Sequence, residues 1–171
     1  MKMKLVPLVL LILGFIPFSV LPGQEKELID ALIQVGPKGT GNKQAVEAWS
    51  AVPKLGASSV PNLLQAMNKA NDLGDNWIRS AISEILARDE QGVPEKQILT
   101  FLQDEQNSGS ARKLAFEIIR EHKPKLAHSL TPKFIDDREP TLRRLAVEKL
   151  LESAREAQKP EEAQALFEKV L

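Results

Sequence analysis

Three short phrases of similar pattern recur along the chain at a nearly constant interval. In each phrase, an apolar residue followed by arginine opens an apolar run at helical spacing, and the arginines are Arg79, Arg112 and Arg143. They lie 33 and 31 residues apart. A period of this length is typical of stacked two-helix units, each of which buries its apolar face only against its neighbours. The repeat therefore predicts an elongated, all-helical protein.

The apolar pattern and the prolines divide the chain into nine predicted helices. No segment shows the sustained two-residue alternation of a half-buried strand. Prolines stand where several helices begin, a position at which the missing N–H costs nothing. They are Pro61, Pro94, Pro124, Pro140 and Pro160. The expected helices cover residues 25–35, 42–56, 60–71, 76–88, 94–104, 111–123, 125–135, 141–154 and 161–171. Because the connectors are short, neighbouring helices are expected to be antiparallel.

The beginning of the chain has a different character. Lys2 and Lys4 precede an apolar run that ends at Leu21, which is typical of a secretory signal peptide, with cleavage expected near Gly23. The alternative is an uncleaved membrane anchor, for which a run of about 17 residues with two prolines is marginal. We therefore expect an exported protein, periplasmic or secreted. The expected division is 1–23 as signal peptide or anchor, 24–41 as an N-terminal helix and Gly-rich connector, and 42–171 as the repeat domain.

Charge and composition exclude some classes of protein. The chain has 23 basic and 23 acidic side chains, no cysteine and no tyrosine. Residues 108–149 nevertheless carry 10 basic and 6 acidic side chains, which makes a local basic block. Without cysteine, lipid attachment through a lipoprotein cysteine is excluded and disulfides do not stabilise the fold. The balanced total charge also disfavours binding to nucleic acid.

The repeated phrases resemble the HEAT-repeat family of α-solenoids. The shared features are the apolar-Arg opening followed closely by Ala, and a Val-Pro start of some first helices, at Val60-Pro61 and Val93-Pro94. The resemblance covers about residues 42–171 and extends to exported bacterial HEAT-repeat proteins with no agreed biochemical role. It implies a right-handed α-solenoid of stacked antiparallel helix pairs, with about 3.5–4 repeats. The last helix keeps an apolar stripe to its end, so this domain is also expected to continue in a longer protein, or the stripe is expected to meet a partner or a second copy of the chain.

By that resemblance, an aspartate in each turn pairs with an arginine along the stack. Asp72 or Asp75 would pair with Arg79, Asp104 with Arg112, and Asp137 with Arg143. Physical chemistry alone gives these residues a similar role. The aspartates suit helix N-termini, and the aspartates and arginines suit partly buried ion pairs. These residues are therefore expected to form a structural ladder and to lie outside any binding site.

A candidate partner surface comes from the basic block. Lys113, Phe116 and Arg120 occupy one helix face at spacings of three and four residues, and Arg144 has a comparable position in the next unit. The resemblance implies that the second helix of each two-helix unit lines the concave surface of the solenoid. There these cations would form a basic strip suited to an acidic protein tail or a polyanion. The alternative is that Phe116 is buried against neighbouring helices. Trp77 is a second candidate anchor for a partner, or it covers the gap between units.

The chain offers little for catalysis. His122 and His128 are the only histidines and do not share a helix face, and Asp136-Asp137 is a pattern typical of a turn before a helix. No catalytic residue, metal site or cofactor is predicted. The sequence thus favours a noncatalytic protein-binding or scaffolding solenoid. The alternatives are a lyase-type enzyme on a HEAT-like scaffold and a membrane-anchored structural protein.

Overall fold

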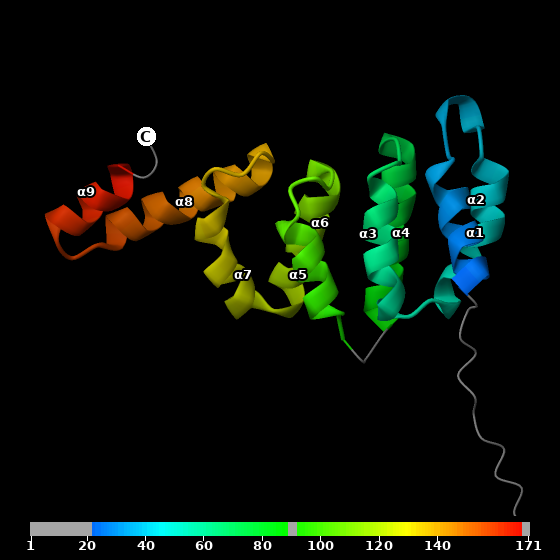
Figure 1. Cartoon of the computed structure of the whole chain (residues 1–171), viewed down its shortest axis with the longest axis horizontal. Coiled ribbons are helices and arrows are strands. Elements are labelled where there is room, and N and C mark those ends of the chain that lie inside the picture. Colours follow the sequence, from blue (N-terminus) through cyan, green and yellow to red (C-terminus); the bar gives the residue numbers. More distant parts are fainter. Residues whose placement is uncertain (1–21, 89–91, 169–171) are drawn as a thin grey trace, which may run out of the picture.

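The computed structural model describes residues 22–88 and 92–168 (Figure 1). Within these residues the fold is all-helical and has no β-strand, which confirms the predicted all-α class. The α-helices are α1 (Pro22–Ile33), α2 (Asn42–Trp49), α3 (Val60–Met67), α4 (Asp72–Arg88), α5 (Glu95–Gln103), α6 (Gly109–His122), α7 (Pro124–Leu130), α8 (Pro140–Glu156) and α9 (Pro160–Glu168). The 3₁₀ segments are η1 (Pro37–Gly39), η2 (Val52–Lys54), η3 (Ala57–Ser59) and η4 (Thr131–Phe134). None of the described helices combines the length and apolar character that a bilayer span requires.

The predictions for the first and the last residues of the chain can be compared with the structure only where residues are described. The predicted signal segment lies outside the described residues except at its last two positions, where α1 already begins. In α9 the described side chain of the apolar stripe is Phe167, which is exposed. The side chains of Ala163 and Leu166 and the residues 169–171 lie outside what the structure describes.

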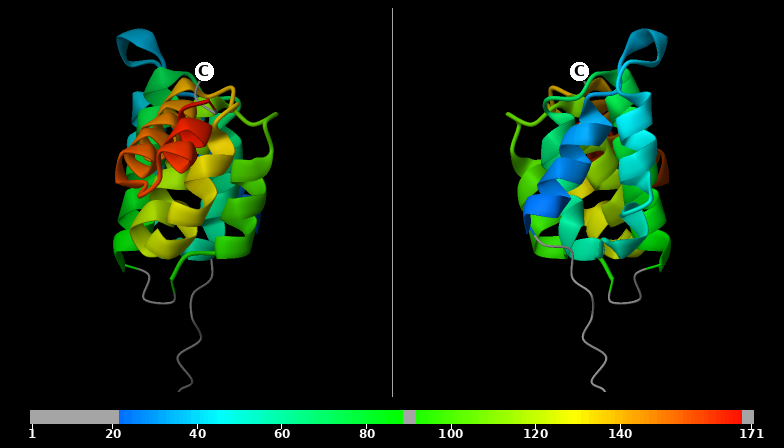
Figure 2. Two further views of the ribbon diagram at one scale, coloured as in Figure 1. Left: turned by 90° about the vertical axis from the view of Figure 1, so that its left-hand side faces the viewer. Right: turned by 90° about the vertical axis from the view of Figure 1, so that its right-hand side faces the viewer.

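The helices from α1 to α6 lie side by side in a row, and α8 and α9 turn away from it (Figure 1). Helix α3 contacts both α1 and α5, and we call these three helices the first layer. Helices α2, α4 and α6 form the second layer, because Trp49 of α2 meets Trp77 of α4 and Arg79 of α4 meets Glu117 of α6. Figure 2 views this row from its two ends, with α1 and α2 nearest the viewer on the right.

Helix boundaries differ from the expected ones mainly at prolines. The helix expected over 42–56 ends at Trp49 and continues as η2 around Pro53. The helix expected over 125–135 ends at Leu130, and η4 contains Pro132. A proline removes an N–H from the helical ladder and crowds the preceding turn, so both helices break there. Helix α4 begins four residues earlier than expected because the Asn71 side chain accepts hydrogen bonds from the first N–H groups of the helix.

One apolar core runs along the row and holds the helices together. Six helices, α1, α3, α4, α5, α6 and α8, contribute large side chains that are fully buried. These side chains include Leu32, Leu63, Leu64, Met67, Ile78, Ile82, Ile98, Leu102, Ile119 and Leu142. Burying one such side chain stabilises the fold by about 1.5–3 kcal/mol. Helix α6 has more buried residues than any other described helix: Ala111, Arg112, Leu114, Ala115, Phe116, Ile118 and Ile119.

Asparagine side chains connect successive helix pairs. Asn71 Nδ2 donates to the Val35 carbonyl at 2.8 Å, which joins the start of α4 to the segment just after α1. Asn68 Nδ2 donates to Asn107 Oδ1 at 2.8 Å, and Asn68 Oδ1 accepts from the Ser108 N–H at 2.8 Å. These amides satisfy polar groups of the turns where the units meet, which fixes the spacing of the units.

The arginines of the repeat also connect units, with partners that differ from those expected. Arg112 is buried and binds Asp137 with two hydrogen bonds of 2.8 and 2.6 Å. Its Nε donates to the Leu102 carbonyl at 2.8 Å. The expected pair of Asp104 with Arg112 is wrong, because Asp104 is exposed and accepts a hydrogen bond from the Gln106 N–H of its own turn.

The two other arginines of the ladder bind backbone carbonyls. Arg143 donates to the Asp137 carbonyl at 2.9 Å, and Arg79 donates to the Ser110 carbonyl at 2.9 Å. Asp75 accepts from the Ser110 hydroxyl at 2.6 Å. Arg79 and Arg112 therefore reach forward into the following unit, whereas Arg143 binds the turn before its own helix; Asp75 and Arg79 do not form an ion pair.

Candidate functional site

The expected partner surface on α6 lacks its apolar centre. Phe116 is only 2% exposed, and its ring packs edge-on against Phe134 of η4 with a centroid distance of 5.3 Å. The prediction that Phe116 anchors a partner is wrong, because η4 folds back over this face of α6. The alternative stated from the sequence, burial against neighbouring helices, describes its position.

The cations of the expected basic strip face carboxylates of the same surface. Lys113 Nζ and Arg79 Nη1 lie 3.9 and 3.7 Å from the two carboxylate oxygens of Glu117. Arg144 Nε lies 3.5 Å from Glu148 Oε1 on α8. Arg120 is exposed and has no ion-pair partner among the described residues. Two of the three cations of the strip, Lys113 and Arg144, are thus partly neutralised, which weakens the case for an acidic partner on this face.

The sequence left two interpretations of Trp77 open, an anchor for a partner or a cover for the gap between units. Its ring meets the ring of Trp49 edge-on, with centroids 5.5 Å apart and an interplanar angle of 75°. Both side chains are half-buried, and together they bridge α2 and α4. Trp77 therefore covers the gap between two units and also keeps part of its surface open to solvent.

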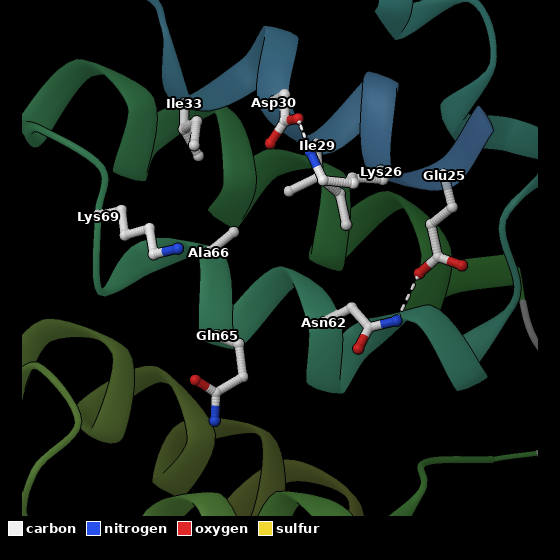
Figure 3. Close-up of a pocket in the computed structure, with 9 residues that line it drawn as sticks. All are labelled: Glu25, Lys26, Ile29, Asp30, Ile33, Asn62, Gln65, Ala66 and Lys69. Carbon is white, nitrogen blue, oxygen red and sulfur yellow. Dashed lines mark hydrogen bonds and ion pairs between the residues drawn. The ribbon is translucent and has the colours of Figure 1, made fainter. Parts of the chain in front are cut away.

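A groove that sequence reasoning missed lies on the first layer, between α1 and α3 (Figure 3). Its volume is about 400 Å³. Ile29, Ile33 and Ala66 give it an apolar floor. The polar lining residues are Glu25, Lys26, Asp30, Asn62, Gln65 and Lys69. An apolar floor with a polar rim is the usual composition of a surface that binds another molecule.

The charges of this groove are arranged along its length. At one end Asn62 Nδ2 donates to Glu25 Oε1 at 2.9 Å, and one turn further Lys26 pairs with Asp30 (Figure 3). The hydrogen bond to Asp30 raises the pKa of Lys26 above its usual value. At the other end the Lys69 ammonium has no ion-pair partner among the described residues. The groove is therefore acidic at the start of α1 and basic at the end of α3.

A second groove lies beside the first one. It lies between α3 and α5, has a volume of about 420 Å³ and shares Gln65 with the first groove. Its other lining residues are Pro61, Lys96, Gln97, Thr100, Phe101, Asp104 and Asn107. Because Gln65 of α3 lines both grooves, the two grooves lie side by side on the first layer, one on each side of α3. We call the two grooves together the Gln65 furrow. Its existence depends on the distance between helices, which no local spacing in the sequence encodes.

The described residues contain no group of three or more His, Asp or Glu side chains arranged to hold a metal ion. Both histidines are exposed. Of the adjacent acids, Asp136 is exposed and Asp137 is held by Arg112, so the two carboxylates do not converge. No family model, curated protein or solved structure matches the chain.

Proposed function

We propose that this chain is a HEAT-like, right-handed α-solenoid that binds a protein partner outside the cytoplasm without catalysing a reaction. The observation that carries this proposal is the Gln65 furrow, two adjacent solvent-open grooves lined by apolar and polar side chains of α1, α3 and α5. A partner segment that occupied both grooves would contact all three helices of the first layer. Solenoids bind in this way, through extended surfaces built from repeated units.

The contacts between units support the stacked arrangement. Asn71 reaches the Val35 carbonyl across 36 residues, Asn68 reaches Asn107 across 39, and Arg79 reaches the Ser110 carbonyl across 31. These separations are close to the 33- and 31-residue period of the arginines. Contacts between these neighbouring helix pairs therefore join residues about one period apart, which supports a stacked arrangement.

Export is the part of the proposal that rests on the first residues. Lys2 and Lys4 followed by an apolar run favour a signal peptide, so the folded row would act in the periplasm or outside the cell. Intact-mass measurement of the protein recovered from the exported fraction tests this part. We expect a mass that lacks about the first 23 residues, whereas the full-length mass would contradict cleavage.

Photocrosslinking tests the binding surface. A photoreactive amino acid is placed at Gln65 in the furrow, and in a matched variant at Ser129, which is exposed on α7 and lines neither groove. We expect irradiation of intact cells to give a discrete protein adduct from position 65 and a much weaker one from position 129. Substituting Ala66→Arg, which fills the floor of the furrow, should remove the adduct. Equal adducts at both positions, or none at position 65, would contradict the proposal.

A further inference from the structure

The two helices that form the groove between α1 and α3 run in the same direction. Asn62, near the start of α3, donates to Glu25, near the start of α1. Ile33, the last residue of α1, lines the same groove as Lys69, which follows α3 (Figure 3). Both helices therefore begin at one end of the groove. Because a helix carries positive partial charge at its N-terminus and negative partial charge at its C-terminus, a third helix beside them is favoured when it runs antiparallel to both.

The charged side chains at the two ends of this groove have no ionic partner. In the middle, Lys26 and Asp30 pair with each other and leave no net charge. At one end the Glu25 carboxylate accepts a hydrogen bond from the neutral Asn62 amide, and at the other end lies the Lys69 ammonium. Neither of these two end charges forms an ion pair within the described part of the chain. A bound segment is therefore favoured when it brings an acidic group to Lys69 and a basic group to Glu25.

The two preferences describe the same kind of segment. A helix that runs antiparallel to α1 has its first turn beside Lys69 and its last turn beside Glu25. Acidic side chains stabilise the first turn of a helix and basic side chains stabilise the last turn. The charge that each end of the groove requires is thus the charge that a helix stably carries there. Between the ends, Ile29 and Ile33 lie one turn apart on α1, which suits the apolar stripe of an amphipathic helix.

Building on the proposed function of the Gln65 furrow, on which this assignment rests, we propose that the partner's segment in the groove between α1 and α3 is an amphipathic α-helix. It runs antiparallel to α1, with acidic residues in its first turn beside Lys69 and basic residues in its last turn beside Glu25. Its apolar stripe packs on Ile29, Ile33 and Ala66. Recognition of a helix in a groove is read through anchors that repeat at one-turn intervals.

The order of crosslinked sites in the partner tests the helix and its direction. A photoreactive amino acid replaces Ile33 in one variant and Asn62 in another, at opposite ends of the groove. After irradiation of intact cells, mass spectrometry identifies the partner residue that each position captures. Ile33 follows Glu25, the neighbour of Asn62, by eight residues, which is about 12 Å along α1.

We expect the partner residue captured from Ile33 to precede the one captured from Asn62 by about eight residues, since a helix in the groove has the same rise per residue as α1. An extended segment would place the two captured residues only about three or four apart. A parallel helix would reverse their order. Either result would overturn the proposal.

Charge reversal tests the two ends of the groove. The photoreactive amino acid is kept at Gln65, and Lys69→Glu or Glu25→Lys is added. We expect each reversal to lower the yield of the partner adduct about fivefold or more, because attraction to the partner's charge becomes repulsion. The matched control is Lys54→Glu, since Lys54 is exposed like Lys69 but lines neither groove. It should leave the yield unchanged.

A compensating substitution in the partner completes the test. The acidic residue nearest Lys69, located through the adduct from Ile33, is replaced by lysine, and this should restore the adduct in the Lys69→Glu variant. Failure to restore it, or an adduct at Gln65 that survives both charge reversals, would overturn the helix with charged ends while the furrow remained a binding surface. Absence of any adduct at Gln65 in the chain without charge reversals would instead contradict the proposed function itself.

Discussion

The guanidinium of Arg112 and the carboxylate of Asp137 form a buried ion pair that joins α6 to the turn before α8. Two hydrogen bonds of 2.8 and 2.6 Å connect them, and their side chains are 3% and 4% exposed. The same guanidinium binds the Leu102 carbonyl at the end of α5. One arginine thus holds three parts of the row together. Removing its partner would leave a charge buried without compensation.

We expect Asp137→Ala to lower the free energy of unfolding by about 3–5 kcal/mol, because the Arg112 charge would remain buried and unpaired. Urea denaturation followed by circular dichroism measures this loss. The matched control is Glu148→Ala, which breaks an exposed pair with Arg144 and should cost about 0–1 kcal/mol. Equal losses for the two variants would show that the buried pair contributes no more than a surface pair.

The same carboxylate should make stability depend on pH. Burial raises the pKa of Asp137, but the hydrogen bonds from Arg112 and from the Glu139 N–H outweigh it and hold the pKa below its usual value. Since the pKa is lower in the folded state than in the unfolded state, this stabilisation is complete above the unfolded pKa. It is lost as the pH falls through the folded one.

Urea midpoints of the wild type and of Asp137→Asn, measured from neutral pH downward, test this dependence. We expect the difference between the two proteins to be constant above about pH 5 and to shrink below about pH 4, where the unfolded carboxyl takes up its proton. A difference that widens on acidification would contradict the assignment of a lowered pKa to Asp137.

Gly74 sits in α4 where α1 approaches most closely. A Cβ atom at this position would lie 3.0 Å from the Ile33 carbonyl oxygen and 3.1 Å from its Cα. An exposed glycine inside a helix normally gains about 1 kcal/mol on replacement by alanine. At Gly74 we expect the opposite sign, a loss of about 1–3 kcal/mol, because the backbone of α1 would have to move. Thermal unfolding of Gly74→Ala, compared with Ser83→Ala on the exposed face of α4, measures the effect. A more stable Gly74→Ala protein would show that α1 can shift without cost.

Asn68 connects the end of α3 to the turn before α6. Its amide serves both Asn107 Oδ1 and the Ser108 N–H, so Asn68→Ala leaves two groups of that turn without a protein partner. We expect a loss of about 1–3 kcal/mol and faster hydrogen exchange at Ser108. The control Asn62→Ala removes one exposed hydrogen bond to Glu25 and should change stability by about 0.5 kcal/mol or less. Unchanged exchange at Ser108 would contradict this role.

The sequence allowed some residues to be interpreted correctly and others not. Arg112 was expected to be structural from its place in the repeat, and it is buried in an ion pair; its partner, however, comes from the next unit and not from Asp104. Phe116 shares a face with Lys113 and Arg120 by helical spacing, yet Phe134, eighteen residues later, covers it. Spacing along one helix says which residues lie on one face and cannot say what packs against that face.

The sequence by itself determined the all-helical class, the number of described helices and most of their ends. These depend on interactions within a few residues, such as the prolines Pro61, Pro124, Pro140 and Pro160 at helix starts and the apolar spacing within each helix. Only the tertiary structure decided the partner of Arg112, the meeting of Trp49 with Trp77 and the Gln65 furrow. Each of these depends on the distance and rotation between helices, which result from the packing of the whole core.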